Sequence, residues 1–315
     1  MVKPRVCIIC IAYNHEHWIQ EALESVAMQD YYHKELIIVD NGSSDQTRDK
    51  IQSWVTSFTG LFTVKTIFKN EEQPYCALFN EVLAEVDCEY VVDLAGDDVF
   101  YPDHLSQSVK LLEKDNQAAF VFSDAYILDQ RGGVNNFYKR NGFGELMEVI
   151  ELGIIYETLL KRSFICAATI VFNARILKAE GGYDASLYYE DFDIQLRLTR
   201  KYPVLFSNHV GVLKRQHRNS MSAGQYASHR SNMLPSTVLI CEKAKEMNRT
   251  PQEDHALGER VMYELKHALW SANFQAADSL IDLGKRLKIK RPLFGFYKLW
   301  AKSRIDISWI YEKAT

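Results

Sequence analysis

Two hydrophobic patterns alternate through the first half of the chain. Short apolar or β-branched runs predict β-strands that are buried in a sheet. Between these runs, apolar residues recur at helical spacing, as they do from Trp18 to Val26, and predict amphipathic helices. Strands that alternate with helices favour an α/β fold with a mostly parallel central sheet flanked by helices. The expected strands cover residues 6–11, 36–39, 63–68, 90–94 and 118–122.

The pattern changes in the second half. From about Gly132 to Gly153 it weakens into Gly, Asn and Phe, which indicates a mobile loop over a site. A further strand is expected at 167–172, and a helix is expected to begin at Glu190. Beyond about Gln225 only helical runs are found. We therefore expect an α/β domain over residues 1–225 and a helical C-terminal region over residues 226–315.

Composition favours a soluble globular protein. The 315 residues are 47% hydrophobic and 25% charged, with 7 prolines, so the chain is neither disordered nor fibrous. The N-terminus runs straight into the first strand without a signal-peptide pattern, and no apolar stretch approaches about 18 residues. These features predict a cytosolic location.

The six cysteines lie scattered among apolar residues, as expected of reduced core thiols. Cys7 and Cys10 form a C-x-x-C pattern, but they lie within an expected strand. Side chains three residues apart in a strand point to opposite faces of the sheet, so neither a zinc site nor a redox site is expected there.

The C-terminal tail, residues 283–315, is a different kind of surface. It carries nine Lys and Arg against two acidic residues, a net charge of +7, while the rest of the chain carries −11. Aromatic and aliphatic residues interleave with these cations. The combination suits a helix lying on an anionic membrane, but equally a helix that packs its aromatics onto the catalytic domain, or a homodimer contact. Because the body of the protein is acidic, nucleic-acid binding is not expected.

The most informative candidate site is the pair Asp97-Asp98, which follows the apolar run from Tyr90 to Leu94. Adjacent carboxylates repel each other and resist burial, so a pair at the end of a buried strand indicates a bound cation. Oxygen ligands suit a hard divalent ion, which at the carboxyl end of a parallel strand would clamp a diphosphate. The alternative is two solvated loop acids.

Further polar clusters follow other expected strands or open a helix: Asp40 to Asp45, the pair Glu190-Asp191, and the segment around His217. Together with Asp97-Asp98, this ordered set resembles the inverting glycosyltransferases of family 2, which have the Rossmann-like GT-A fold, and in particular those of bacterial glycan assembly. The resemblance covers about residues 6–220. Its motifs are Val6 to Asn14, Ala22 to Val26 with Gln29, Val39 to Asp45, Gly96 to Asp98, Gly181 to Asp184 and Glu190-Asp191.

The resemblance implies a role for each cluster. Asp98 and His217 would hold a divalent metal, Mn²⁺ or Mg²⁺. Asp191 would be the catalytic base, and Glu190 would contact or orient the acceptor. The nucleotide would be bound by Ala12, Tyr13, Asn14, Asp40, Asn41, Asn80 and Asp97. The alternatives are structural: acids at a helix start stabilise its N-terminus, and a lone His or Asn is often a surface residue.

The sequence also departs from the family pattern. Asn41 replaces the second residue of the usual Asp-Asp, Ile11 replaces a small polar residue, and Gln73-Pro74 and Phe79 replace the common Gly and Arg. An amide can still bind a uracil edge, because it both donates and accepts hydrogen bonds.

The resemblance implies transfer from a nucleotide sugar, a UDP-sugar in first place, to a hydroxyl of a glycan or lipid-linked glycan, in the cytosol or peripherally at the inner face of the membrane. A sugar-phosphate nucleotidyltransferase is a rival, but it would show a Gly-rich basic loop after the first strand, which residues 12–17 lack. A catalytically inactive binding scaffold is the second rival. Asn41 and Ile11 motivate it, and the retained Asp98 and Asp191 speak against it.

Overall fold

The computed structural model describes residues 3–218 and 220–314, and the chain divides into two compact units. The sheet unit contains the chain up to Ile155 together with Ile165–Ala185 and Arg197–Gln216. The helical unit contains Tyr156–Phe164, Ser186–Leu196 and the chain from His217 onwards. A domain boundary at residue 225 stays a proposal.

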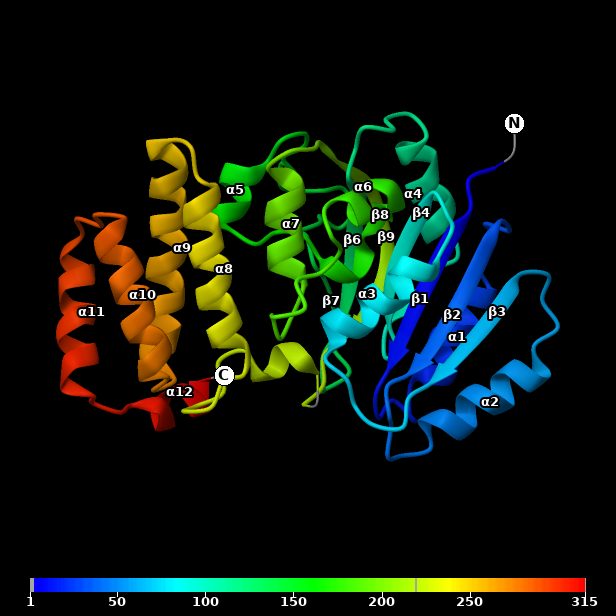
Figure 1. Ribbon diagram of the computed structural model, residues 1–315, viewed down its shortest axis with the longest axis horizontal. Coiled ribbons are helices and arrows are strands. Elements are labelled where there is room, and N and C mark those ends of the chain that lie inside the picture. The colour runs from blue at the N-terminus through cyan, green and yellow to red at the C-terminus, as the bar shows by residue number, and fades with distance from the viewer. Residues whose placement is uncertain (1–2, 219, 315) are drawn as a thin grey trace. The chain divides into compact units, whose positions relative to one another are not determined.

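All the strands of the described residues lie in the sheet unit and form one nine-stranded sheet (Figure 1). The order is β3-β2-β1-β4-β8-β6-β9-β5, and β7 pairs with β6. The ladders joining β1 to β2, β1 to β4, β2 to β3 and β6 to β9 are parallel, so the predicted α/β fold is confirmed. The strands are β1 (Val6–Ala12), β2 (Lys34–Asp40), β3 (Thr63–Phe68), β4 (Tyr90–Ala95), β5 (Val99–Phe100), β6 (Phe120–Leu128), β7 (Val134–Asn136), β8 (Val171–Asn173) and β9 (Val204–Arg215).

The core of the sheet unit follows from the alternation of side chains along the strands. Val6, Ile8 and Cys10 of β1 are fully buried in one cluster with the apolar faces of three helices. Burial of each such aliphatic side chain contributes about 1.5–3 kcal/mol. The three helices of the cluster are α1 (Ile19–Ala27), α2 (Thr47–Ser57) and α4 (His104–Leu112), while α3 (Tyr75–Glu85) also contacts β1, and α6 (Ala174–Ala179) contacts β4 and β8.

One strand prediction needs correction, and one long strand was not predicted. The run at 167–172 is not one strand: Ala167–Thr169 is a 3₁₀ turn, and β8 spans only three residues. The hydroxyl of Thr169 donates to the carbonyl of Ser123 and accepts from its N–H, each at 3.1 Å, so a side chain takes the place of the backbone ladder. The twelve-residue β9 was not expected, because Ser207, Asn208 and His209 interrupt its apolar pattern.

The loop expected from Gly132 to Gly153 is held to the sheet at its start. Residues of β7 pair with β6, the ring of Tyr138 is buried, and Arg140 forms an ion pair with the buried Asp124 at 2.6 Å. Farther along, Phe143 and Val149 are each 92% exposed. The mobility of this segment stays a prediction.

The helical unit is built around α9, which contacts α5, α8, α10 and α11 (Figure 1). Thr250 and Glu253 form a capping box at the start of α9, and Pro251 occupies the first turn, where its missing N–H costs nothing. None of the described helices is both long and apolar enough to cross a bilayer. The helices are α5 (Tyr156–Lys161), α7 (Asp191–Thr199, which continues into the sheet unit), α8 (Met233–Met247), α9 (Pro251–Trp270), α10 (Phe274–Arg286), α11 (Pro292–Ser303) and α12 (Ser308–Ala314).

A tight turn after α6 is fixed by Asn80 of α3. The amide of Asn80 donates to the carbonyl of Tyr183 at 2.7 Å and accepts from its N–H at 2.8 Å. The Tyr183 hydroxyl in turn donates to Asp93 of β4 at 2.9 Å. Gly182 makes the turn possible: its φ is +67°, and an added Cβ would lie 2.3 Å from the Asn80 Oδ1.

Gly182→Ala is therefore expected to lower the free energy of unfolding by about 1–3 kcal/mol, because it adds left-handed strain and displaces the Asn80 amide. Gly142→Ala is the matched control, since Gly142 has no atom within 4 Å of an added Cβ and no positive φ. Urea denaturation of both variants measures the difference. Equal stabilities of the two variants would contradict this account of the turn.

Candidate active site

The loops after β1 and β2 meet at one edge of the sheet. The two strands are parallel, and Ala12 is paired with Asp40 at their carboxyl ends. Asn14, with φ of +55°, donates its backbone N–H to the Ser43 hydroxyl at 2.9 Å, and its side-chain oxygen accepts from the N–H of Ser44 at 2.8 Å. The two predicted nucleotide-binding loops are thus joined by hydrogen bonds.

Asp40 lies at the base of this edge and is fully buried. Its carboxylate accepts from the Nε of Arg48 at 2.9 Å and from the N–H of Ser43 at 3.3 Å. The Arg48 guanidinium also lies 5.3 Å from the centre of the Phe68 ring. These two hydrogen bonds, one of them from a cation, hold the carboxylate in place, so Asp40 organises the loop. Its contact with a nucleotide stays a prediction.

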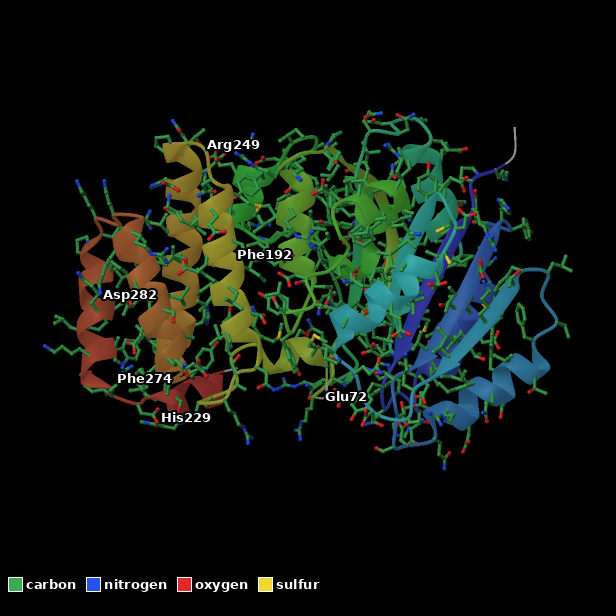
Figure 2. All side chains as sticks on the ribbon, viewed as in Figure 1. Glu72, Phe192, His229, Arg249, Phe274 and Asp282 are labelled. Atoms are coloured by element: carbon green, nitrogen blue, oxygen red, sulfur yellow. The ribbon has the colours of Figure 1, made fainter. Side chains whose placement is uncertain are left out.

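Asn41 is also buried, and its amide is engaged by the chain itself. It donates to the carbonyl of Gln73 and accepts from the Gln73 N–H, both at 2.9 Å. Glu72, labelled in Figure 2, is the neighbour of Gln73. Its carboxylate hydrogen-bonds the Tyr13 hydroxyl and raises the pKa of Tyr13. The loop of residues 71–73 therefore closes against both predicted nucleotide-binding loops.

The pair Asp97-Asp98 directly follows β4, as predicted, and both residues are buried. Arg215, the last residue of β9, holds the pair: its N–H donates to Asp98 Oδ1 at 2.9 Å, and its guanidinium donates to the Asp97 carbonyl at 2.6 Å. The same guanidinium pairs with Glu21 of α1. No feature of the sequence pattern marked Arg215 for this role.

The pKa of Asp98 is raised to about 7, first by burial and then by the charge of Asp97, while Lys214 and Arg215 oppose the rise. Such a carboxyl resists ionisation until a cation approaches. Across residues 3–218 and 220–314, no group of three or more His, Cys, Asp or Glu side chains is arranged to hold a metal. The pair fits an ion such as Mg²⁺, which is commonly held by one or two carboxylates and completed by water and substrate phosphates.

Glu190, Asp191 and His217 belong to the helical unit. Asp191 is the first residue of α7, and its Oδ1 accepts from the N–H of Phe192 at 2.6 Å. The N–H of His217 donates to the Ser220 hydroxyl at 3.0 Å. Assignment of these three residues to the same site as Asp98 stays a proposal.

The segment that carries Glu190-Asp191 is fastened to α8 on both sides. Before the pair, the N–H of Tyr188 donates to the Ser236 hydroxyl at 2.8 Å, and the hydroxyls of Tyr189 and Thr237 are 2.9 Å apart. After it, buried Asp193 forms an ion pair with Lys243. Sequence reasoning missed these α8 residues, because Ser, Thr and Lys within a helix form no distinctive pattern.

Phe192, labelled in Figure 2, gives the same segment a second support. The guanidinium of Arg260, on α9, lies 4.6 Å from the centre of its ring, a cation–π contact. Arg260 also pairs with buried Glu264 at 3.2 Å and donates to the carbonyl of Leu160 on α5 at 3.3 Å. The position of Glu190 and Asp191 within the helical unit is thus set by α8 and α9.

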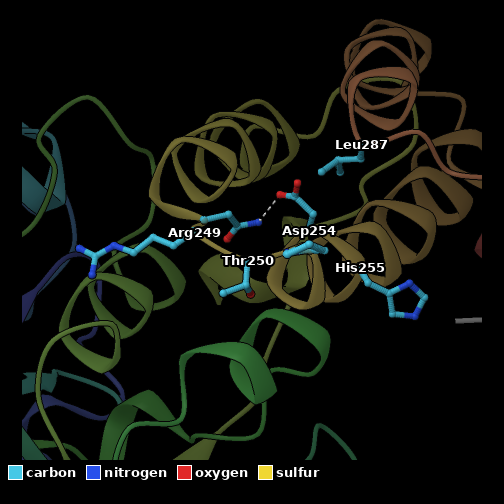
Figure 3. A pocket seen from close by; sticks show the side chains of 7 residues that line it. Arg249, Thr250, Asp254, His255 and Leu287 are labelled. Carbon is cyan, nitrogen blue, oxygen red and sulfur yellow. Dashed lines mark hydrogen bonds between the residues drawn. The ribbon is translucent and has the colours of Figure 1, made fainter.

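A pocket of about 470 Å³ opens at the turn between α8 and α9 (Figure 3). None of the predicted site residues lines it. Its acid, Asp254, is bonded to Lys245 at 3.0 Å and to Asn248 at 2.9 Å. The lining residues are Asn248, Arg249, Thr250, Pro251, Asp254, His255 and Leu287. Because its polar groups stabilise the turn, we assign no role in the candidate site to this pocket.

Comparison with known proteins bears on this arrangement. The model of the family described as "Glycosyl transferase family 2" matches residues 7–179. The chain is 26% identical over 172 residues to the UDP-Glc:alpha-D-GlcNAc-diphosphoundecaprenol beta-1,3-glucosyltransferase WfgD of Escherichia coli, covering 55% of this chain and 61% of that protein. The chain spans 34–65% of the length of the first three curated relatives that it matches.

Two solved structures share the fold. Residues 1–349 of TarS from S. aureus, in complex with UDP-GlcNAc, align with a TM-score of 0.71 at 16% identity, over 99% of this chain and 92% of that one. The mannosyltransferase PcManGT from Pyrobaculum calidifontis, in complex with GDP-Man and Mn²⁺, aligns with a TM-score of 0.63 at 19% identity, over 96% of this chain and 85% of that one. At these identities the likeness shows the fold alone.

Arg215→Ala is expected to loosen the turn that carries Asp97-Asp98, because charge-assisted hydrogen bonds of about 1.5–3 kcal/mol are lost. The free energy of unfolding, measured by urea denaturation, should fall by a similar amount. Glu21→Gln is the control: it removes only the partly exposed ion pair, which is worth at most about 1 kcal/mol. Equal loss in both variants would assign the effect to the ion pair and not to the turn.

Proposed function

The chain belongs to glycosyltransferase family 2, and we propose that it transfers a sugar from a nucleotide donor to a hydroxyl group of a glycan, with inversion at the anomeric carbon. The observation that carries the proposal is the buried pair Asp97-Asp98 at the carboxyl end of β4, within the matched segment. Open α/β sheets bind ligands at such strand ends. The GT-A fold of the family provides the sheet on which the pair lies.

A UDP-sugar is the proposed donor. The bound UDP-GlcNAc of TarS and the UDP-Glc in the name of WfgD support this choice, while the GDP-Man of PcManGT makes a guanine nucleotide the competing donor. The nucleotide would contact the loop from Ala12 to Asn14, with Asp40, Asn41, Asn80 and Asp97. Since the amides of Asn41 and Asn80 already bond to the backbone, they would act mainly by shaping the walls of this site.

Asp98 and His217 are the proposed ligands of Mn²⁺ or Mg²⁺, and the Mn²⁺ in the PcManGT complex supports a divalent ion. When bound, the ion supplies a Lewis acid that neutralises charge on the departing diphosphate. The chain adds positive charge of its own, since Lys214 and Arg215 act electrostatically on Asp98. The metal dependence and its ligands are parts of the proposal.

Transfer by inversion is a single displacement. The acceptor hydroxyl oxygen forms a bond to the anomeric carbon while the bond from that carbon to the diphosphate oxygen breaks. The electron pair of the broken bond leaves with the nucleoside diphosphate. The carboxylate of Asp191 accepts the hydroxyl proton, and Glu190 orients the acceptor. A carboxylate is a sufficient base, because the hydroxyl becomes acidic only late in the displacement.

The acceptor is proposed to be a lipid-linked glycan. The name of WfgD specifies a sugar on diphosphoundecaprenol, which supports an acceptor of this class. The segment from Gly132 to Gly153, with its exposed Phe143 and Val149, is the proposed loop that discriminates between acceptors.

A panel of UDP-Glc, UDP-GlcNAc and GDP-Man, titrated calorimetrically with and without Mn²⁺, tests the donor and the metal together. We expect one donor to bind more tightly with Mn²⁺, and Asp98→Ala to reduce that gain by at least about tenfold. Asp87→Ala, in the exposed turn before β4, should leave binding unchanged. If no nucleotide sugar bound in the presence of metal, the transferase proposal would fail.

Asp191→Asn tests the base, because the amide keeps the oxygen that accepts from the Phe192 N–H and removes only proton-accepting capacity. Release of UDP from the bound donor should slow by about 10²–10⁴-fold while donor affinity stays within about twofold. Glu157→Gln, on the exposed side of α5, is the control. If Asp191→Asn released UDP at the rate of the parent protein, another group would have to accept the proton of the acceptor hydroxyl. Donor binding without turnover in the parent protein itself would favour an inactive scaffold.

A further inference from the structure

Helix α11 packs only one of its faces inward. Phe294, Tyr297 and Ala301, which recur at helical spacing, are buried. The packing against α10 is close, because a Cβ added to Gly284 would lie 2.6 Å from the Phe294 ring. This face of the tail therefore packs onto neighbouring helices of the same unit, α9 and α10.

The opposite face of α11 is apolar and exposed. Leu293, Phe296 and Leu299 are 49%, 56% and 69% exposed, and their spacing of three residues places them along one side of the helix. Exposed apolar residues continue beyond α11 at Ile305 and Trp309. Single exposed apolar residues are ordinary on proteins, but a contiguous row marks an interaction site.

The charge of the tail is concentrated near this row. Four tail cations are neutralised within the helical unit, while Lys288, Lys290, Lys298 and Lys302 have no ion pair with any described residue. All four of these lysines are exposed. Lys298 and Lys302 lie one turn apart on α11 itself, and Lys288 and Lys290 lie in the turn before it. The neutralised pairs are Lys285–Asp282, Arg286–Glu242, Arg291–Glu259 and Arg304–Asp278.

We propose that this surface, formed by Leu293, Phe296 and Leu299 with the four unpaired lysines, docks on an anionic lipid membrane. A helix that lies in the membrane interface buries an apolar face at the acyl boundary and keeps its cations among the headgroups. Charge complementarity favours an anionic membrane as the partner, because each lysine near an anionic surface adds electrostatic attraction. A second copy of the chain would instead bring two sets of unpaired lysines together.

The proposal goes beyond glycosyl transfer and does not rest on it. Docking would hold the enzyme at the surface where lipid-linked molecules reside, whichever donor it uses. Because vesicle binding is measured without a substrate, its failure would leave the proposed activity untouched, and failure of the activity would leave the docking surface untouched.

The experiment is sedimentation of the full-length protein with vesicles of phosphatidylcholine alone, or of phosphatidylcholine mixed with phosphatidylglycerol. We expect binding to the anionic vesicles, weakening as salt rises, and little binding to the neutral ones. Phe296→Ser with Leu299→Ser should reduce binding by about tenfold or more, because the apolar contact is lost. Lys290→Gln with Lys302→Gln should also reduce vesicle binding by about tenfold or more, because the loss of each lysine weakens binding about fivefold.

Lys110→Gln with Lys114→Gln is the matched control, because both lysines are exposed on or just after α4 in the sheet unit and neither has an ion pair among the described residues. This variant should bind vesicles like the parent. Far-ultraviolet circular dichroism and thermal unfolding show that each variant is folded.

Equal sedimentation with neutral and anionic vesicles, or no sedimentation with either, would overturn the proposal. Parental binding by the Phe296→Ser, Leu299→Ser variant would overturn it as well. Light scattering of the protein without lipid identifies the competing occupant. A dimer in the parent that the same variant dissociates, together with no vesicle binding, would assign the surface to a second copy of the chain.

Discussion

The contact of Arg215 with the turn after β4 is the constraint on which the candidate site depends. Two neighbouring carboxylates are buried there, and burial without compensation would cost several kcal/mol. Arg215, at the end of β9, contacts both residues: its backbone N–H donates to the Asp98 carboxylate, and its guanidinium donates to the Asp97 backbone carbonyl. These partners lie 117 and 118 residues apart in sequence, so the two hydrogen bonds form only once β9 has joined the sheet.

The part of the fold that sequence predicted best is the part that packing determines locally. β1 is buried throughout and reads as an unbroken apolar run, residues 36–39 form another within β2, and the run of β4 is interrupted by Asp93. The strand prediction that was wrong and the strand that was not predicted lie where long-range contacts override the local sequence pattern. At Thr169, the side-chain hydroxyl makes the hydrogen bonds to Ser123 that a backbone ladder would otherwise make. β9 tolerates polar residues because it pairs with β6 through two register shifts.

The candidate site divides in the same way. The position of Asp97-Asp98 follows from a buried strand that ends at a turn, and a sequence can show that. The partners that fix the site residues cannot be derived from spacing, because Arg215 for Asp98, α8 for the Glu190 segment and Tyr183 for Asn80 all come from distant parts of the chain. An Asn or Lys within a helix carries no local sign of such a partner.

The hydrogen bonds between Asn41 and Gln73 link two of the positions at which this sequence differs from the family pattern. Asn41 and the segment Gln73-Pro74 are two places where the sequence leaves the family pattern, and the structure brings them into direct contact. The Asn41 amide donates to the carbonyl of Gln73, which a carboxylate cannot do. The two departures therefore meet in one pair of hydrogen bonds, through which the side chain at position 41 fixes the path of the loop at Gln73.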